Sequence, residues 1–206
     1  MTSHQGIQFL KKVCLDVYQC GPFLQGNARG EILTFTHIPP GAGDGRGDGY
    51  KFAIGRTLSA EKHKGFPISD LYSPNEEREE RFVSADESGQ ICLWNRTDMT
   101  VACAKRKDDC FSDPCNSVRI RQNVIAGGFA FGKILLFSAD CGSMLVEINA
   151  HCKSIMAIDF SEDMTVELAH ADCMENMTLT GCCFLGNSKF AVAAYDYAEI
   201  HVFSIS

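Results

Sequence analysis

Four side chains in the middle of the sequence are of types that often act together: an imidazole, a hydroxyl, a carboxylate and an indole. They are His63, Ser84, Asp86 and Trp94, with Glu87 as an alternative carboxylate beside Asp86. His, Ser and Asp are also the residues of a catalytic triad. However, the sequence contains no G-x-S-x-G nucleophile elbow, and a triad would leave Trp94 without a role. Because a buried imidazole and a buried indole N–H both need hydrogen-bond partners, we expect a structural network.

The cysteines and the remaining histidines offer two further kinds of chemistry, metal binding and hydrolytic or thiol catalysis. His170 with Cys173, and the adjacent Cys182 and Cys183, are the best metal-ligand candidates. Zinc sites usually combine two tight ligand pairs, and adjacent residues of a strand point to opposite faces. We therefore expect no metal and no cofactor. A hydrolase or thiol enzyme that uses His151, His170 or a cysteine is the alternative, although no paired motif supports it.

The charge and composition of the chain exclude some classes of function. The 206 residues carry a formal net charge of −7, and 45% of them are hydrophobic, as in a soluble globular protein. An acidic surface repels nucleic-acid phosphates, and two aspartates follow the short basic run at residues 105–107, so we expect no nucleic-acid partner. No apolar run is long enough for a transmembrane helix, and the N-terminal charges follow the first apolar patch. We therefore expect a cytoplasmic protein whose cysteines are mostly buried thiols.

The elements that must position the four side chains are strands of a repeated unit. Four segments share Gly or Ala, a polar residue, Ile, two further residues and an aromatic: GEILTF, GQICLW, GKILLF and AEIHVF. Their alternation has the period of β-strands. The aromatics that end them are Phe35, Trp94, Phe137 and Phe203, which are 59, 43 and 66 residues apart. The middle spacing matches a propeller repeat of about 40–45 residues, four strands in each.

Two intervals depart from this period for visible reasons. The first contains a run of small and polar residues at 39–49, which we interpret as a flexible, glycine-rich inserted loop. In the third interval, Ile155–Phe160 and Leu179–Phe184 both have the pattern of a first strand, and between Phe160 and Val166 there is no room for two more strands. The sequence therefore predicts an all-β chain in which one blade is cut short.

Three segments carry a resemblance to a known family: FVSADESGQICLW (82–94), EINAHCKSIMAIDF (147–160) and FAVAAYDYAEIHVFS (190–204). They resemble the WD40-repeat β-propeller family. The resemblance extends from Thr2 to the C-terminus, and its segments follow one another in the same order as in the family. The resemblance implies an incomplete WD40-type β-propeller over residues 1–206, with about four to five blades of which one is truncated. The chain resembles a shortened form of a longer family member, which has further strands after Phe160.

The resemblance also implies roles for particular residues. His63, Ser84, Asp86 and Trp94 would form the hydrogen-bonded network of one blade, and His151 and His170 would lie between blades. The turn of the third repeat, Phe129–Gly132, lacks the usual acidic residue, so we expect that blade to lack the Asp-centred network and to rely on packing.

The function implied by the resemblance is that of a non-enzymatic scaffold or adaptor, with a loose link to growth-factor signalling and vesicle trafficking. Other proteins would bind loops at the blade ends, such as Gly41–Gly49 and Glu76–Glu80. An incomplete ring would expose sheet edges, so self-association through them is also expected. The protein would be cytoplasmic, with association to vesicles or membranes as a further expectation.

Overall fold

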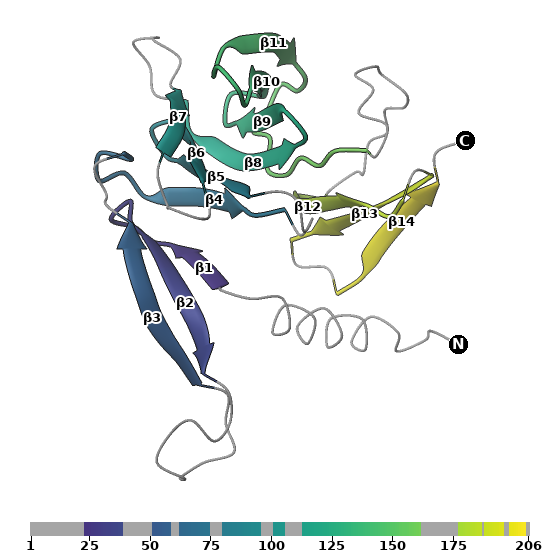
Figure 1. Ribbon diagram of the computed structural model, residues 1–206. Coiled ribbons are helices and arrows are strands. Elements are labelled where there is room, and N and C mark those ends of the chain that lie inside the picture. Colours follow the sequence, from purple (N-terminus) through teal and green to yellow (C-terminus); the bar gives the residue numbers. More distant parts are fainter. Residues whose placement is uncertain are drawn as a thin grey trace. The chain divides into compact units, whose positions relative to one another are not determined.

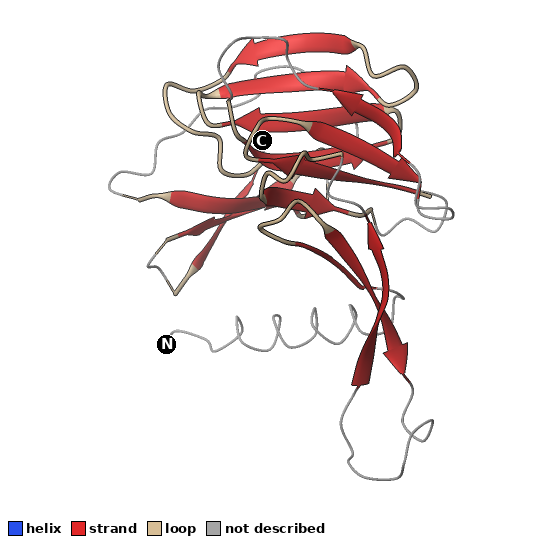
Figure 2. Ribbon diagram, turned by 90° about the vertical axis from the view of Figure 1, so that its left-hand side faces the viewer, coloured by secondary structure: helices blue, strands red, loops and turns tan. Residues whose placement is uncertain are grey.

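The computed structural model describes residues 23–38, 51–58, 62–74, 80–95, 101–105, 113–161, 177–186, 188–195 and 198–204. Within these ranges the chain forms strands and loops, without a helix that is long and apolar enough to cross a membrane (Figures 1 and 2). The predicted all-β class is therefore confirmed. The chain divides into two compact units, residues 1–68 and 69–206. The expected single domain over 1–206 stays a prediction, and the loop predicted at 39–49 lies outside the described residues.

The strands form four antiparallel sheets in which strands adjacent in sequence pair with each other. Sheet 1 contains β1 (Phe23–Gly26), β2 (Ile32–Ile38) and β3 (Lys51–Leu58). Sheet 2 contains β4 (Ile68–Tyr72), β5 (Arg81–Asp86), β6 (Ile91–Asn95) and β7 (Val101–Lys105). Sheet 3 contains β8 (Cys115–Arg121), β9 (Val124–Phe129), β10 (Lys133–Ser138) and β11 (Met144–Asn149). Sheet 4 contains β12 (Leu179–Phe184), β13 (Lys189–Ala194) and β14 (Ile200–Ser204).

The strand register places the four repeated segments at equivalent positions. Each segment forms the second strand of a hairpin: β1–β2, β5–β6, β9–β10 or β13–β14. The Ile of each segment pairs with a small residue of the preceding strand, namely Gly26, Ala85, Gly128 or Ala193. The aromatic at the end of each segment pairs with Phe23, Phe82, Ile125 or Phe190. The same cross-strand geometry is thus built four times from segments that share little more than an Ile and an aromatic.

The turns of the first three hairpins require glycine. Gly30, Gly89 and Gly132 have φ values of 77°, 83° and 82°, which a residue with a Cβ rarely adopts. A Cβ at Gly89 would also collide with the carbonyl of Asp113, and one at Gly132 with the carbonyl of His151. The turn of the fourth hairpin is one residue longer, so Ala198 can stand where the other segments have glycine.

The main core of the second unit lies between sheets 2 and 3. Sheet 2 contributes the face that carries Ile91 and Leu93, which are 3% and 1% exposed. By register, this face corresponds to the face of Ile134 and Leu136 in sheet 3 and of Ile200 and Val202 in sheet 4. We call it the forward face, because in sheet 2 it packs against the next sheet along the chain.

The segment at residues 154–161, here called the inner segment, corrects one sequence prediction. Ile155–Phe160 was expected to form a strand, but no strand is present there. The segment instead lies along the forward face of sheet 3, where Ile158 packs with Ala126 and Leu136. The physical reason is that a strand needs a hydrogen-bonding ladder, and no described strand pairs with this segment. The other first strand predicted in this region, Leu179–Phe184, is β12.

Two isoleucines at equivalent positions test how much the forward face contributes to stability. We expect Ile91→Ala to lower the free energy of unfolding by about 2–5 kcal/mol, because its side chain is fully buried. Ile200→Ala at the same register position should cost about 1 kcal/mol or less, because that side chain is 53% exposed. Urea unfolding of dilute protein, followed by circular dichroism and by the fluorescence of the single Trp, measures both. Equal losses for the two variants would contradict the assignment of the core.

Candidate functional site

Trp94 and Ser84 join the two central strands of sheet 2. The indole Nε1 of Trp94 donates a hydrogen bond of 2.7 Å to the hydroxyl oxygen of Ser84. The ring of Phe82 stacks on the indole with a centroid distance of 5.9 Å and an interplanar angle of 5°. All three side chains are buried, on the face opposite to Ile91 and Leu93. The donor that a buried indole carries is therefore satisfied within the sheet.

The carboxylate of Asp86 holds the turn between β5 and β6. Its Oδ1 accepts hydrogen bonds from the backbone N–H of Ser88 at 2.8 Å and of Gln90 at 3.0 Å, and from the Ser88 hydroxyl at 2.7 Å. The Gly89 N–H closes the turn on the Asp86 carbonyl at 3.0 Å. Glu87, the alternative carboxylate, is exposed. Asp86 is therefore the residue of the pair that organises the turn.

Sheet 1 contains the same turn with an amide in place of the carboxylate, a feature missed by the sequence analysis. Oδ1 of Asn27 accepts hydrogen bonds from the N–H groups of Arg29 at 2.9 Å and Glu31 at 3.0 Å, two and four residues further on. The Gly30 N–H closes this turn on the Asn27 carbonyl at 3.2 Å. The signal was present in the sequence, because Asn27 precedes Gly30 at the same spacing as Asp86 precedes Gly89. Comparing the residues before each repeated segment would have found it.

Sheet 3 holds the equivalent turn with a carboxylate from outside the turn. Phe129, at the position of Asp86, ends β9 and is buried, whereas the sequence analysis had placed it in the turn itself. The N–H of Phe131, two residues on, donates to Oδ1 of Asp113 at 3.0 Å. Asp113 lies just before β8, so it supplies from another strand connection the acceptor that the turn lacks. The blade packs in the core as expected, but its turn also has an acidic acceptor, which the sequence analysis missed.

The other predicted site residues fall in different places. His63 is buried in the first unit, where its carbonyl accepts the Phe66 N–H at 2.9 Å. Ser84, Asp86 and Trp94 belong to the second unit, so the set of four stays a prediction. His151 is exposed in the connection after β11, and its Nδ1 accepts the Lys153 N–H at 3.0 Å.

The structure describes only some of the remaining predicted residues. His170 lies outside the described residues, as does the side chain of Phe35. Phe137 is buried, and Phe203 is half-buried and stacks on Phe190 at 5.1 Å.

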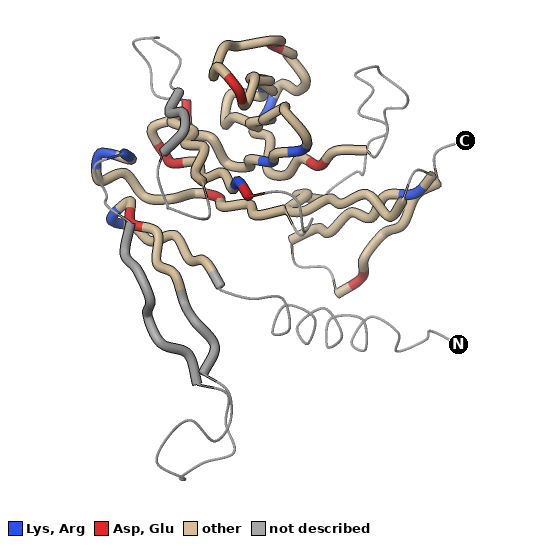
Figure 3. The backbone as a smooth tube through the Cα atoms, in the orientation of Figure 1, with Lys and Arg blue, Asp and Glu red and all other residues tan. Residues whose placement is uncertain are grey.

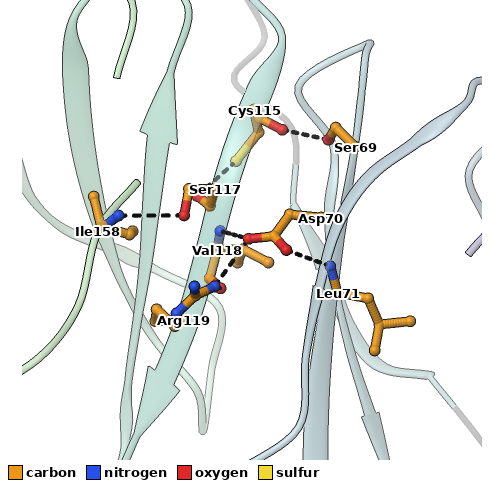
Figure 4. Close-up of polar contacts among 8 residues, drawn as sticks. All are labelled: Ser69, Asp70, Leu71, Cys115, Ser117, Val118, Arg119 and Ile158. Atoms are coloured by element: carbon orange, nitrogen blue, oxygen red, sulfur yellow. Dashed lines mark hydrogen bonds and ion pairs between the residues drawn. The ribbon is translucent and has the colours of Figure 1, made fainter. Parts of the chain in front are cut away.

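Three hydrogen bonds of one kind link the first strands of sheets 2, 3 and 4 (β4, β8 and β12) and the inner segment, here called the innermost segments. Asp70 of β4 accepts the Val118 N–H at 2.9 Å, and Ser117 of β8 accepts the Ile158 N–H at 3.3 Å (Figure 4). Asp159 then accepts the Phe184 N–H of β12 at 2.8 Å. In each case a side chain of one innermost segment binds the backbone of the next. In this series of contacts the inner segment therefore lies between β8 and β12, in the place that the first strand of a sheet would take.

Arg119 reinforces the first of these links. Its guanidinium lies 2.9 Å from the carboxylate of Asp70 and 4.7 Å above the centre of the Tyr72 ring. The Ser69 hydroxyl donates to the Cys115 carbonyl beside it (Figure 4). Asp70 thus accepts from a backbone amide and from a guanidinium at once, an arrangement suited to fixing two strands together rather than to proton transfer.

The described cysteines differ in the chemistry that they could perform. Burial raises the pKa of Cys115 far above its ordinary value, and burial with the charge of Asp159 raises the pKa of Cys182 to about 11. In contrast, hydrogen bonds from Ser143 and Ser138 lower the pKa of the exposed Cys141 to about 7. Cys182 and Cys183 lie on opposite faces of β12. Among the described residues, no group of three or more His, Cys, Asp or Glu side chains could hold a metal ion.

Substitutions of Asp86 test the role of the turn. Asp86→Ala leaves two buried backbone donors and a hydroxyl without this acceptor, so we expect it to lower the free energy of unfolding by about 3 kcal/mol or more. Asp86→Asn should cost less than half as much, because Asn27 holds the turn of sheet 1 with an amide oxygen. Urea unfolding monitored by Trp94 fluorescence measures both. Equal losses would show that the negative charge matters more than the turn.

Alkylation of Cys141 tests its predicted reactivity. Because its pKa is lowered to about 7, half of this thiol is ionised near neutral pH, and the rate of reaction with iodoacetamide should reach half its maximum there. Mass spectrometry of the Cys141 peptide over a pH series gives this midpoint. Ser143→Ala, which removes the largest cause of the shift, should move it toward the ordinary thiol value. A wild-type midpoint at that ordinary value would contradict the hydrogen-bonded geometry.

Comparisons with known proteins agree with this architecture. The model of the WDR54 family matches residues 56–165, more than half of the chain. Human WD repeat-containing protein 54 is 28% identical over 250 residues, which cover 99% of this chain and 73% of the relative. WD repeat domain 54 of Rattus norvegicus is 25% identical over 246 residues, which cover 97% of this chain and 72% of the relative. Both alignments span more positions than this chain has residues, so the relatives contain residues within the matched span that this chain lacks.

The solved structures extend the likeness to the fold. The crystal structure of the computationally designed Ika4 protein superposes with a TM-score of 0.53 at 14% sequence identity, covering 90% of this chain and 86% of that one. The fold is an incomplete WD40-type β-propeller. Because the family match spans sheets 2 and 3, whose turns and register are those of repeated blades, the chain belongs to the WDR54 family.

Proposed function

We propose that this chain is a non-catalytic scaffold that binds other proteins through the turns and connections at the ends of its sheets. The observation that carries the proposal is the side chain of Phe131, which is 66% exposed at the tip of the turn between β9 and β10. Large aromatic side chains are enriched among the residues that dominate binding energy at protein interfaces. An exposed Phe on a propeller turn is therefore a candidate anchor for a partner.

The backbone that carries Phe131 is held on several sides. The Phe131 N–H donates to Asp113, and the Ala130 N–H donates to the Pro114 carbonyl at 2.9 Å. The Gly132 carbonyl accepts the N–H groups of Ala150 and His151 at 3.1 and 3.0 Å. A partner that covers Phe131 would order little more than one side chain, which lowers the entropic cost of binding.

The surroundings of Phe131 give this surface a mixed character. The connection at residues 150–153 packs against the turn through Gly132 and exposes His151 and Lys153. We call Phe131, His151 and Lys153 the tip surface. An exposed aromatic ring on the turn and an exposed cationic side chain on the adjoining connection suit a partner that offers an apolar side chain and a carboxylate. Tyr195, also 66% exposed, stands in the corresponding turn of sheet 4.

The catalytic alternative has one feature in its favour. Cys141 has the lowered pKa of a reactive thiol, but the groups that lower it are serines, and the charge of Asp140 raises it. A thiol catalyst also needs a positioned acid or base to protonate its leaving group. A scaffold accounts for the exposed aromatics, which a thiol enzyme leaves unexplained. From the family resemblance we also propose a role in growth-factor signalling or vesicle trafficking, and a cytoplasmic or vesicle-associated location.

The proposal is tested by comparing Phe131→Ser with Leu145→Ser. Leu145 of β11 is 52% exposed, so it controls for the loss of an exposed apolar side chain elsewhere on the same sheet. We expect proximity labelling in cells, with each full-length variant fused to the labelling enzyme, to show partners that Phe131→Ser depletes several-fold and Leu145→Ser retains. Circular dichroism checks that both variants fold. Identical partner sets for the wild type and for Phe131→Ser would refute the tip surface as the binding site.

A further inference from the structure

A second exposed aromatic residue belongs to the same kind of turn as Phe131. By register, Tyr195 of sheet 4 occupies the position of Ala130 in sheet 3, the residue before Phe131. The Tyr195 N–H donates to the Thr178 carbonyl at 2.8 Å, just before β12, as the Ala130 N–H donates to the Pro114 carbonyl just before β8. The side chains of Phe131 and Tyr195 are each 66% exposed. Two successive sheets thus each carry a large aromatic side chain on a turn that hydrogen bonds hold in place.

The contacts of the inner segment place these two turns at the same end of the second unit. At the start of the segment, the Ile155 N–H donates to the Phe129 carbonyl at 3.0 Å, beside the turn of sheet 3. At its other end, Asp159 accepts the Phe184 N–H, at the end of β12 that is furthest from the turn of sheet 4. The inner segment and β12 therefore run in the same direction, and the two aromatic turns face the same side.

We propose that one segment of a partner protein contacts both turns, with one apolar side chain for each aromatic ring. This inference rests on the proposed scaffold function and specifies its partner. Charge determines the order of residues in the partner segment. Lys153 is the exposed cation of the tip surface, whereas Glu199 is exposed in the turn of sheet 4. The segment therefore carries a carboxylate near the side chain that meets Phe131, and a cation near the one that meets Tyr195.

Two further carboxylates of the second unit favour the same placement. Asp113 is engaged by the Phe131 N–H at 3.0 Å. In sheet 2, Glu87 and Ser88 stand at the register positions of Ala130 and Phe131, and Glu87 is exposed while Ser88 is buried. That turn thus offers a carboxylate without an aromatic ring, and it repels the acidic end of the segment. Figure 3 shows charged residues scattered over the described part of the chain, so single charges rather than a large patch determine the fit.

Proximity labelling with full-length variants tests whether one partner uses both turns. The partners that Phe131→Ser depletes should also be depleted several-fold by Tyr195→Ser. The matched control is Leu185→Ser, which should retain them, because Leu185 is 41% exposed in the turn at the opposite end of sheet 4. Partners that Phe131→Ser depletes and Tyr195→Ser retains would overturn this inference and leave the scaffold function in place. Partner sets that Phe131→Ser leaves unchanged would refute both.

Footprinting of the purified full chain with hydroxyl radicals tests whether the two aromatic rings are accessible. Mass spectrometry should show that Phe131 and Tyr195 are oxidised much faster than Phe82, which is fully buried. Adding a purified partner from the depleted set should slow the oxidation of both rings together. Slow oxidation of either ring in the free chain would mean that another part of the chain covers it, and would overturn the proposal.

Charge reversal tests the order of residues in the partner segment. With the same purified partner, Lys153→Glu and Glu199→Lys should each raise the dissociation constant a few-fold at low salt, and high salt should reduce the difference. The control is Lys189→Glu, at an exposed lysine on the opposite end of the β13–β14 hairpin, which should leave the constant unchanged. These exposed substitutions keep the test valid if circular dichroism shows that Tyr195→Ser fails to fold. A dissociation constant that either Lys153→Glu or Glu199→Lys leaves unchanged would overturn the proposed order.

Discussion

The packing of one apolar face of each sheet against the next segment of the chain is the constraint on which the second unit depends. A meander of three or four short strands is barely stable alone, because one of its faces would remain in water. Each buried Ile or Leu of a forward face contributes about 1.5–3 kcal/mol through removal from water. Ile91 and Leu93 obtain this stabilisation from sheet 3. Leu136 of sheet 3 obtains it from the inner segment, through Ile158.

The inner segment shows how the chain bridges the place of a shortened blade. Its backbone forms no ladder with a described strand, yet it keeps the links that join the innermost segments to one another. Ser117 binds its Ile158 N–H, and its own Asp159 binds the Phe184 N–H of β12. The segment can therefore stay in place without forming a strand, because its apolar side chains and polar side-chain contacts are directed at the neighbouring sheets.

The sequence was sufficient to predict the hairpins but not every contact that holds them. The spacing from glycine to Ile to aromatic is local, and the register of all four hairpins follows it. The missing ladder of Ile155–Phe160 could not be read from a local pattern, because a strand depends on what lies beside it. The role of Asp113 was equally hidden, since its bond to Phe131 crosses 18 residues of sequence and two strands. Only Asn27 carried a signal, its spacing to Gly30, that a closer reading could have used.

The turn between β9 and β10 shows how a structural need can make a position available for binding. In sheet 2 the turn acceptor is Asp86 itself, and the residue two positions on, Ser88, is buried in the same hydrogen-bonded turn. In sheet 3 the acceptor comes from Asp113, so Phe129 can enter the core at the position of Asp86. Phe131 then keeps its backbone bond while its ring extends into solvent. Two aromatic residues that are two positions apart thus have different roles: Phe129 stabilises the sheet, and Phe131 is available to a partner. The carboxylate of Asp113 makes this possible, because it supplies the acceptor that the turn would otherwise lack.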